Sequence, residues 1–146
     1  NIGADKYSRV GEGYRAANKL VVICAAVILV VLELFNRQLI EIFLGADGTA
    51  TAVSTGRDYL IFMGFFFCFI GFKMAVDGLL RGAGDMKMFT VANIVNLFIR
   101  VFVAMVFAPR YGIHMVWVAV PIGWFVNWAT SFSQYRTGKC KKIYEK

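Results

Sequence analysis

The chain has 146 residues, of which 59% are hydrophobic and 17% are charged, and its formal net charge is +7. This apolar fraction is more than a soluble domain of such length can bury, which excludes an ordinary globular protein and places the chain in a membrane. A membrane β-barrel is also excluded, because its strands alternate over about ten residues and the apolar runs here are continuous and longer. We expect an all-α, polytopic membrane helix bundle.

Four apolar stretches approach or reach the length of about 20 residues that a transmembrane helix needs. We predict four antiparallel transmembrane helices, with spans over about 16–38, 57–81, 87–108 and 112–135. Residues 38–44 keep apolar positions on one side and a glutamate on the other. This pattern predicts an interfacial helix that extends the first span.

Short polar turns separate the predicted spans. Asp47 or Thr49 is placed to cap the helix that follows, which contains the second span. Gly82, Gly84 and Asp85 predict a tight turn between the second and third spans, and no strand precedes them as a nucleotide-binding fingerprint would require.

Basic residues gather on one side of a chain with four crossings. The N-terminal segment, the turn after the second span and the C-terminal tail share that side, which carries Lys6, Arg9, Arg15, Lys19, Arg81, Lys87, Arg136, Lys139, Lys141, Lys142 and Lys146. Because cytoplasmic flanks carry the excess of Lys and Arg, we expect both ends of this segment on the cytoplasmic side of the plasma membrane. Such flanks contact anionic lipid, so we expect membrane lipid and not nucleic acid as a partner.

The second span carries three charges at intervals of four residues, Lys73, Asp77 and Arg81. This spacing places them on one helix face, with Asp77 about 6 Å and Lys73 about 12 Å deeper than Arg81. Charge in a bilayer is costly, so the face is predicted to look into the protein or a wet cavity. Either Asp77 only neutralises Lys73, or it is a carboxylate whose pairing switches during transport.

The third span has a polar stripe that consists of Thr90, Asn93, Asn96 and Arg100. Such a stripe either forms hydrogen bonds between helices or lines a water-filled cavity. Arg100 lies about 20 Å from the inner interface, and Glu33 in the first span lies about 21 Å from it. Depth therefore permits a Glu33–Arg100 ion pair, with a local Glu33–Arg37 pair as the alternative.

Tryptophans mark one face of the last span, where Trp117, Pro121, Trp124 and Trp128 recur at helical spacing. Pro121 removes a backbone hydrogen bond and predicts a kink unless a neighbour compensates. Trp124 and Trp128 lie deeper than an interfacial anchor. Their faces would hold a lipophilic cation by cation–π attraction, or they pack against other helices.

Four segments carry a family resemblance: "NIGADKYSRVGEGYRAA", "FLGADGTATAVSTGRDYL", "DGLLRGAGDMKMF" and "YGIHMVWVAVPIGWFVNW". In this order they resemble the C-terminal half of multidrug and toxic compound extrusion (MATE) transporters, along the whole chain. The resemblance implies an antiporter with two six-helix lobes that works by alternating access. This chain would supply the last four helices, in the C-terminal lobe, with the preceding helices of the same transporter as its partners.

The resemblance further implies efflux of small organic, cationic compounds, driven by Na⁺ or H⁺ and without another cofactor. Some sodium-coupled members carry a cation-binding acid further from the Arg-Gly turn, near Ile70 here, so Asp77 is a candidate on local chemistry. The candidates for a substrate or ion pathway are Asp77, Lys73, Arg100, Asn93, Asn96, Trp124 and Trp128.

No nucleophile, base or metal-ligating cluster converges in the sequence, so we expect neither an enzyme nor a metal site. Two alternatives remain open. One is a lipid-linked precursor flippase of the same superfamily, and the other is a small self-assembling four-helix membrane protein or channel.

Overall fold

A computed structural model describes residues 1–4, 6–45 and 48–137. They form the helices α1 (Tyr7–Leu44), α2 (Ala50–Gly82), α3 (Met86–Tyr111) and α4 (His114–Arg136). Each of these four helices is long and apolar enough to cross a membrane, and the described residues contain no strand. The prediction of an all-α membrane helix bundle is confirmed.

α1, α2 and α3 extend beyond the predicted spans at both ends, most of all at the start of α1 and α2, whereas α4 begins two residues later than predicted. Hydropathy detects only the apolar part of a helix, whereas polar flanking residues continue the same helix into the interface. α1 also continues without a break through residues 38–44, which form its last turns. At the start of α2 the Thr49 side chain accepts a hydrogen bond of 3.2 Å from the backbone N–H of Ala52. Asp47, the other predicted cap, lies outside the described residues.

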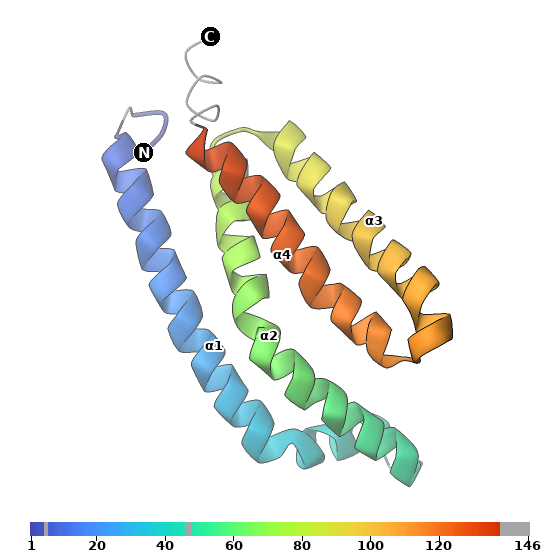
Figure 1. Ribbon diagram of the computed structural model, residues 1–146. Helices are drawn as coiled ribbons and strands as arrows, with labels where there is room; N and C mark the ends of the chain where they lie inside the picture. Colours follow the sequence, from blue (N-terminus) through green and yellow to red (C-terminus); the bar gives the residue numbers. More distant parts are fainter. Residues whose placement is uncertain (5, 46–47, 138–146) are drawn as a thin grey trace.

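The four helices form two hairpins that meet along α2 and α4 (Figure 1). α1 packs on α2, α3 packs on α4, and α2 also contacts α4, whereas the contact between α2 and α3 is small. The start of α1, the turn from α2 to α3 and the end of α4 lie at the same end of the bundle (Figure 1). We call it the turn end. The predicted antiparallel arrangement therefore holds, while the basic residues from Lys139 onward lie outside the described part.

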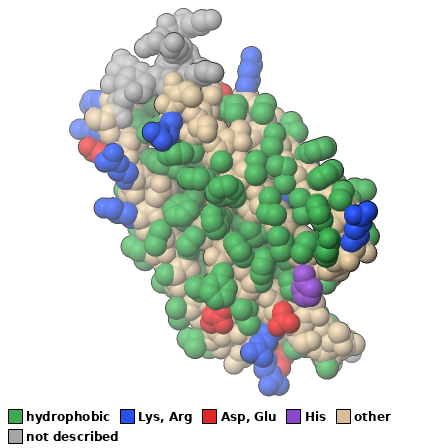
Figure 2. All heavy atoms as spheres, viewed as in Figure 1, with side chains coloured by type: hydrophobic (Ala, Val, Ile, Leu, Met, Phe, Trp, Pro, Cys, Tyr) green, Lys and Arg blue, Asp and Glu red, His purple; other side chains and the backbone are tan. Residues whose placement is uncertain are grey.

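The outer surface of the bundle is largely apolar. Large hydrophobic side chains are exposed on every helix, among them Phe43 at 92% and Met105 at 72%. They cover the middle of the face in Figure 2, and most charged side chains lie towards the two ends. Apolar patches this large are stable only against lipid or other apolar helices. The chain is therefore part of a multi-pass membrane protein.

The turn at Gly82, Gly84 and Asp85 joins the two hairpins tightly. Gly84 has φ of 70°, a left-handed conformation that favours glycine because other residues place their Cβ against the backbone there. Asp85 caps α3 by accepting a hydrogen bond of 3.1 Å from the Met88 N–H. Its other carboxylate oxygen accepts one of 2.8 Å from Gln134 in α4. This turn thus ties the start of α3 to the end of α4.

Candidate functional site

An ion pair between Lys73 and Asp77 lies inside the bundle. The Lys73 Nζ and the Asp77 Oδ2 are 2.7 Å apart, and the two side chains are only 16% and 4% exposed. The spacing of four residues along α2 brings them together, as the sequence predicts. A buried pair persists when further hydrogen bonds compensate for the lost hydration of both charges.

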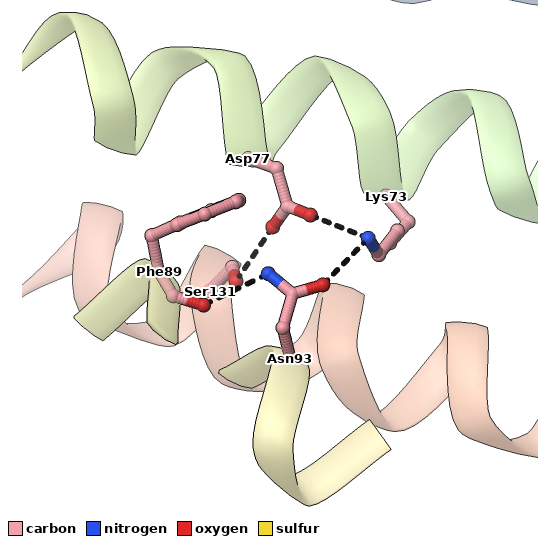
Figure 3. A network of polar contacts seen from close by, with 5 residues as sticks. All are labelled: Lys73, Asp77, Phe89, Asn93 and Ser131. Atoms are coloured by element: carbon pink, nitrogen blue, oxygen red, sulfur yellow. Dashed lines mark hydrogen bonds and ion pairs between the residues drawn. The ribbon is translucent and has the colours of Figure 1, made fainter. Parts of the chain in front are cut away.

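Such hydrogen bonds come from the two other helices that surround the pair (Figure 3). Lys73 Nζ also donates to Asn93 Oδ1 of α3 at 2.9 Å. Ser131 Oγ of α4 donates to Asp77 Oδ1 at 3.2 Å. We call Lys73, Asp77, Asn93 and Ser131 the Lys73–Asp77 cluster. It joins α2, α3 and α4 through one pair of opposite charges.

Arg81, the third charge of the predicted stripe, takes no part in the cluster. It is exposed at the turn end, where its guanidinium carbon lies 5.2 Å from the centre of the Phe89 ring. Of the two basic residues one turn from Asp77, the structure thus pairs it with Lys73, which lies deeper than Arg81.

The residues of the polar stripe of α3 lie in different surroundings in the structure. Thr90 is exposed and donates to the backbone oxygen of Met86 at 2.8 Å. Asn93 belongs to the Lys73–Asp77 cluster, and Asn96 is buried. Arg100 is half-buried, and its Cγ and Cδ lie against the backbone of Gly123 in α4. The deeper part of the stripe therefore faces α4.

α3 and α4 approach most closely at Gly123. A Cβ atom built there would clash with Asn96 Oδ1 and would lie 2.7 Å from Arg100 Cγ. Real Cβ atoms do not approach other atoms so closely, so glycine is required for the observed packing of these two helices.

Replacing Gly123 with Ala is therefore expected to lower the free energy of unfolding by about 1–3 kcal/mol, because overpacking displaces Asn96 or Arg100. Thermal unfolding of the full-length protein in detergent measures this effect. Gly78→Ala in α2 is the matched control, since a Cβ at this exposed position meets nothing within 4 Å. Equal melting temperatures for the two variants would contradict the prediction.

A second polar stripe, on α4, was not predicted from the sequence. Asn127, Ser131 and Gln134 recur at intervals of four and three, and Ser131 and Gln134 bond to Asp77 and Asp85. The tryptophans of the same span, and not these polar residues, were the predicted functional positions. The sequence signal for this stripe is the same as for the third span, namely polar residues at helical spacing in an otherwise apolar segment.

The Glu33–Arg100 pair that depth would permit does not form. The ion pairs recorded for the described residues are Lys73–Asp77 and an exposed Arg37–Glu41 pair of 2.8 Å. α1 and α3 lie on opposite sides of the bundle, which separates Glu33 from Arg100 although their depths agree (Figure 1). The local alternative is also wrong, because Arg37 bonds to Glu41 and not to Glu33.

The two deep tryptophans of α4 lie in different surroundings. Trp124 is buried, with 8% of its surface exposed. Trp128 is half-buried and stacks on Phe132, with ring centres 5.3 Å apart and planes inclined by 9°. α4 continues unbroken across Pro121, which is buried. Burial within the bundle thus accounts for Trp124 and aromatic stacking for Trp128, and a contact of either with a cationic ligand stays a prediction.

Comparisons with known proteins show which protein family the chain belongs to. The family model described as MatE matches residues 1–106, which include Lys73, Asp77 and Asn93. A curated relative, "Probable multidrug resistance protein YpnP" of Bacillus subtilis (strain 168), is 29% identical over 115 residues. The match covers 78% of this chain and 25% of the relative, so the chain spans about a quarter of the relative's length. No solved structure matches the chain.

Proposed function

This chain belongs to the MatE family of multidrug and toxic compound extrusion transporters, and we propose that it acts within a secondary active exporter. The exporter moves small organic, cationic compounds out of the cell by alternating access, in exchange for Na⁺ or H⁺. The name of the relative supports this proposal, since that protein is called a probable multidrug resistance protein. No cofactor other than the coupling ion is proposed.

We further propose that the chain supplies the last four helices of a transporter with two lobes. The preceding helices of the same protein would then cover part of the exposed apolar surface of α1 and α3, where Leu34 is 67% and Phe98 68% exposed. Lipid would cover the rest. The fraction of the relative that matches, 25%, supports this placement.

The proposed orientation places the turn end at the cytoplasmic face of the plasma membrane. Described basic residues near this end include Arg9, Lys87 and Arg136, which come from three different helices. Cytoplasmic flanks of membrane proteins carry such an excess.

The Lys73–Asp77 cluster supports a mechanism that couples ion binding at Asp77 to the packing of α2 against α3 and α4. A charged Asp77 holds Lys73 within α2 and accepts a hydrogen bond from Ser131 of α4. When Asp77 binds a proton or Na⁺, Lys73 loses its counter-charge, and the contacts of α2 with α3 and α4 change together. An ion that binds one arrangement better than the other shifts the equilibrium between them, as alternating access requires.

The substrate pathway is proposed to run along α3 and α4, near Asn96, Arg100, Trp124 and Trp128. An aromatic face stabilises a bound cation by about 0.5–2 kcal/mol, which favours the two tryptophans as substrate contacts. Arg100 repels cations, so the substrate would pass on the tryptophan side of the pathway.

Transport by the full-length protein in lipid vesicles tests the proposal. A lipophilic cationic dye is expected to accumulate against its own gradient only while a Na⁺ or a proton gradient is imposed, and an ionophore that dissipates the gradient should stop it. Comparing the two gradients identifies the coupling ion.

The same assay distinguishes the exporter from the two alternative functions, a channel and a lipid-linked precursor flippase. Dye flux that needs no ion gradient would indicate a channel. Absence of dye flux together with translocation of a lipid-linked precursor would indicate a flippase. Either result would overturn the proposed export mechanism.

A further inference from the structure

Asn127, in the middle of α4, has an amide group with no protein partner. The residue is fully buried, and neither its Oδ1 nor its Nδ2 forms a hydrogen bond in the described part of the chain. Asn96 in α3 is 8% exposed, and its Oδ1 is likewise without a partner among the described residues. Buried polar groups in proteins are hydrogen-bonded to protein or to ordered water.

The position of Asn127 connects it to polar groups on both sides. Gly123, Asn127 and Ser131 follow one another at intervals of four residues and so share one face of α4. Ser131 donates to Asp77, and Gly123 lies against Asn96 and Arg100. Asn127 therefore lies one helical turn from the Lys73–Asp77 cluster and one turn from the Asn96 side chain.

The spacing suits a bridging molecule of small size. One turn of an α-helix rises about 5.4 Å, which is close to the span of two hydrogen bonds in series through one water oxygen. Because Asn127 has no exposed surface, the described residues already enclose it. A helix from elsewhere in the transporter therefore cannot supply the missing hydrogen bonds.

The types of unpartnered atoms identify the chemical class of the ligand. Two carbonyl oxygens need a donor, and the Asn127 amide nitrogen needs an acceptor. A metal cation would satisfy only the oxygens, and an anion only the nitrogen. Water both donates and accepts. Exchanging the oxygen and nitrogen of Asn127 leaves this requirement unchanged, since both atoms are unpartnered.

We propose that ordered water is bound between α3 and α4, where it bridges the Asn127 and Asn96 side chains. With Ser131 one turn away, this water extends the polar contacts of Asp77 to the level of Arg100. The inference rests on the buried amides and not on transport. If Asp77 couples transport, the water supplies a hydrated connection between Asp77 and the proposed pathway.

The first test detects the water in the full-length protein in lipid, labelled with ¹⁵N-asparagine and with leucine that carries ¹³C-methyl groups. Solid-state NMR with magnetisation transfer from water is expected to show rapid transfer to the Asn127 side-chain amide, assigned by its loss in Asn127→Leu. The methyl groups of Leu80, fully buried in an apolar cluster with Ala83, are the dry reference. Transfer to Asn127 as slow as to Leu80 would overturn the proposal.

The second test is a double-mutant cycle in thermal unfolding. Asn96→Leu and Asn127→Leu are each expected to lower the melting temperature by a few degrees, and together by no more than the larger single effect, since both remove one shared bridge. A raised melting temperature in Asn127→Leu would reveal a dry, unpaired amide. That result, or additive effects, would overturn the proposal.

Thr130→Val combined with Asn127→Leu is the matched control pair. The Thr130 hydroxyl donates to the backbone oxygen of Val126 within α4, at 2.8 Å, so no shared bridge links it to Asn127. Its effect is expected to add to that of Asn127→Leu. Neither test measures transport, so failure of the proposed export mechanism would leave both outcomes interpretable.

Discussion

Gradient-driven efflux is expected to fall to background when Asp77 is replaced with Asn in the full-length transporter. Asn has the same shape and still accepts a hydrogen bond from Ser131, but it carries no charge for Lys73 and binds no proton. Because the two arrangements of the protein then no longer differ in their affinity for the ion, the gradient cannot drive the cycle. Efflux of a cationic dye from vesicles, at matched protein levels in the membrane, measures the loss.

Ser131→Ala is the control for this prediction. It removes the hydrogen bond of 3.2 Å to Asp77 Oδ1 but leaves the carboxylate and its ion pair with Lys73 in place. Efflux is expected to weaken and to keep its dependence on the gradient. Full efflux by the Asp77→Asn protein would show that Asp77 serves only to neutralise Lys73.

The largest effect on stability is expected from Lys73→Met. Asp77 would keep its charge, only 4% exposed, without an opposite charge beside it. Removing one partner of a buried ion pair costs about 3–5 kcal/mol, since the remaining charge stays desolvated. Thermal unfolding of the full-length protein in detergent should therefore shift to clearly lower temperature.

A double variant shows whether the loss of thermal stability in Lys73→Met comes from the unpaired charge of Asp77. Lys73→Met with Asp77→Leu leaves no buried charge at this place, and its melting temperature is expected to return close to that of the natural protein. Its coupled efflux should remain absent. A Lys73→Met protein as stable as the natural one would indicate that Asp77 is hydrated or neutral in the bundle.

Arg37→Gln provides the surface comparison. It breaks the other recorded ion pair of the described residues, Arg37–Glu41, whose side chains are 78% and 50% exposed. Exposed pairs of this kind contribute little, because water and salt already screen both charges. The melting temperature is expected to stay unchanged.

The sequence predicted those parts of the site that depend on one helix. Lys73 and Asp77 are four residues apart, and any α-helix brings such residues together. The helix class and the tight turn at Gly84 were likewise predictable from local patterns. These features need no knowledge of how the helices pack.

The partners of the pair could not be predicted in the same way. Asn93 and Ser131 reach Lys73 and Asp77 because α3 and α4 are rotated to face α2, and rotation about a helix axis is set by packing. The absence of the Glu33–Arg100 pair, which depth alone would permit, has the same cause. Depth in the bilayer fixes one coordinate of a residue, while a contact also requires that the two helices be neighbours.

The predicted spans are shorter than the helices for a related reason. Apolar runs mark the part of a helix that lies in hydrocarbon, and α1 and α2 begin well before these runs. The Thr49 cap was the local signal for the start of α2, because its side chain accepts from the N–H of Ala52. No side-chain cap marks the start of α1.

The location of Lys73 and Asp77 within a single helix also matters during synthesis. Each charge alone opposes insertion into the bilayer by about 2.5–3.5 kcal/mol, but two opposite charges one turn apart neutralise each other as soon as α2 is helical. The part of α2 from 59 to 80, whose charged residues are Lys73 and Asp77, can thus enter the membrane as an electrically neutral segment while the ribosome is still making α3. α3 carries Arg100 without an acidic residue of its own, so its stable insertion depends on what has been inserted before it.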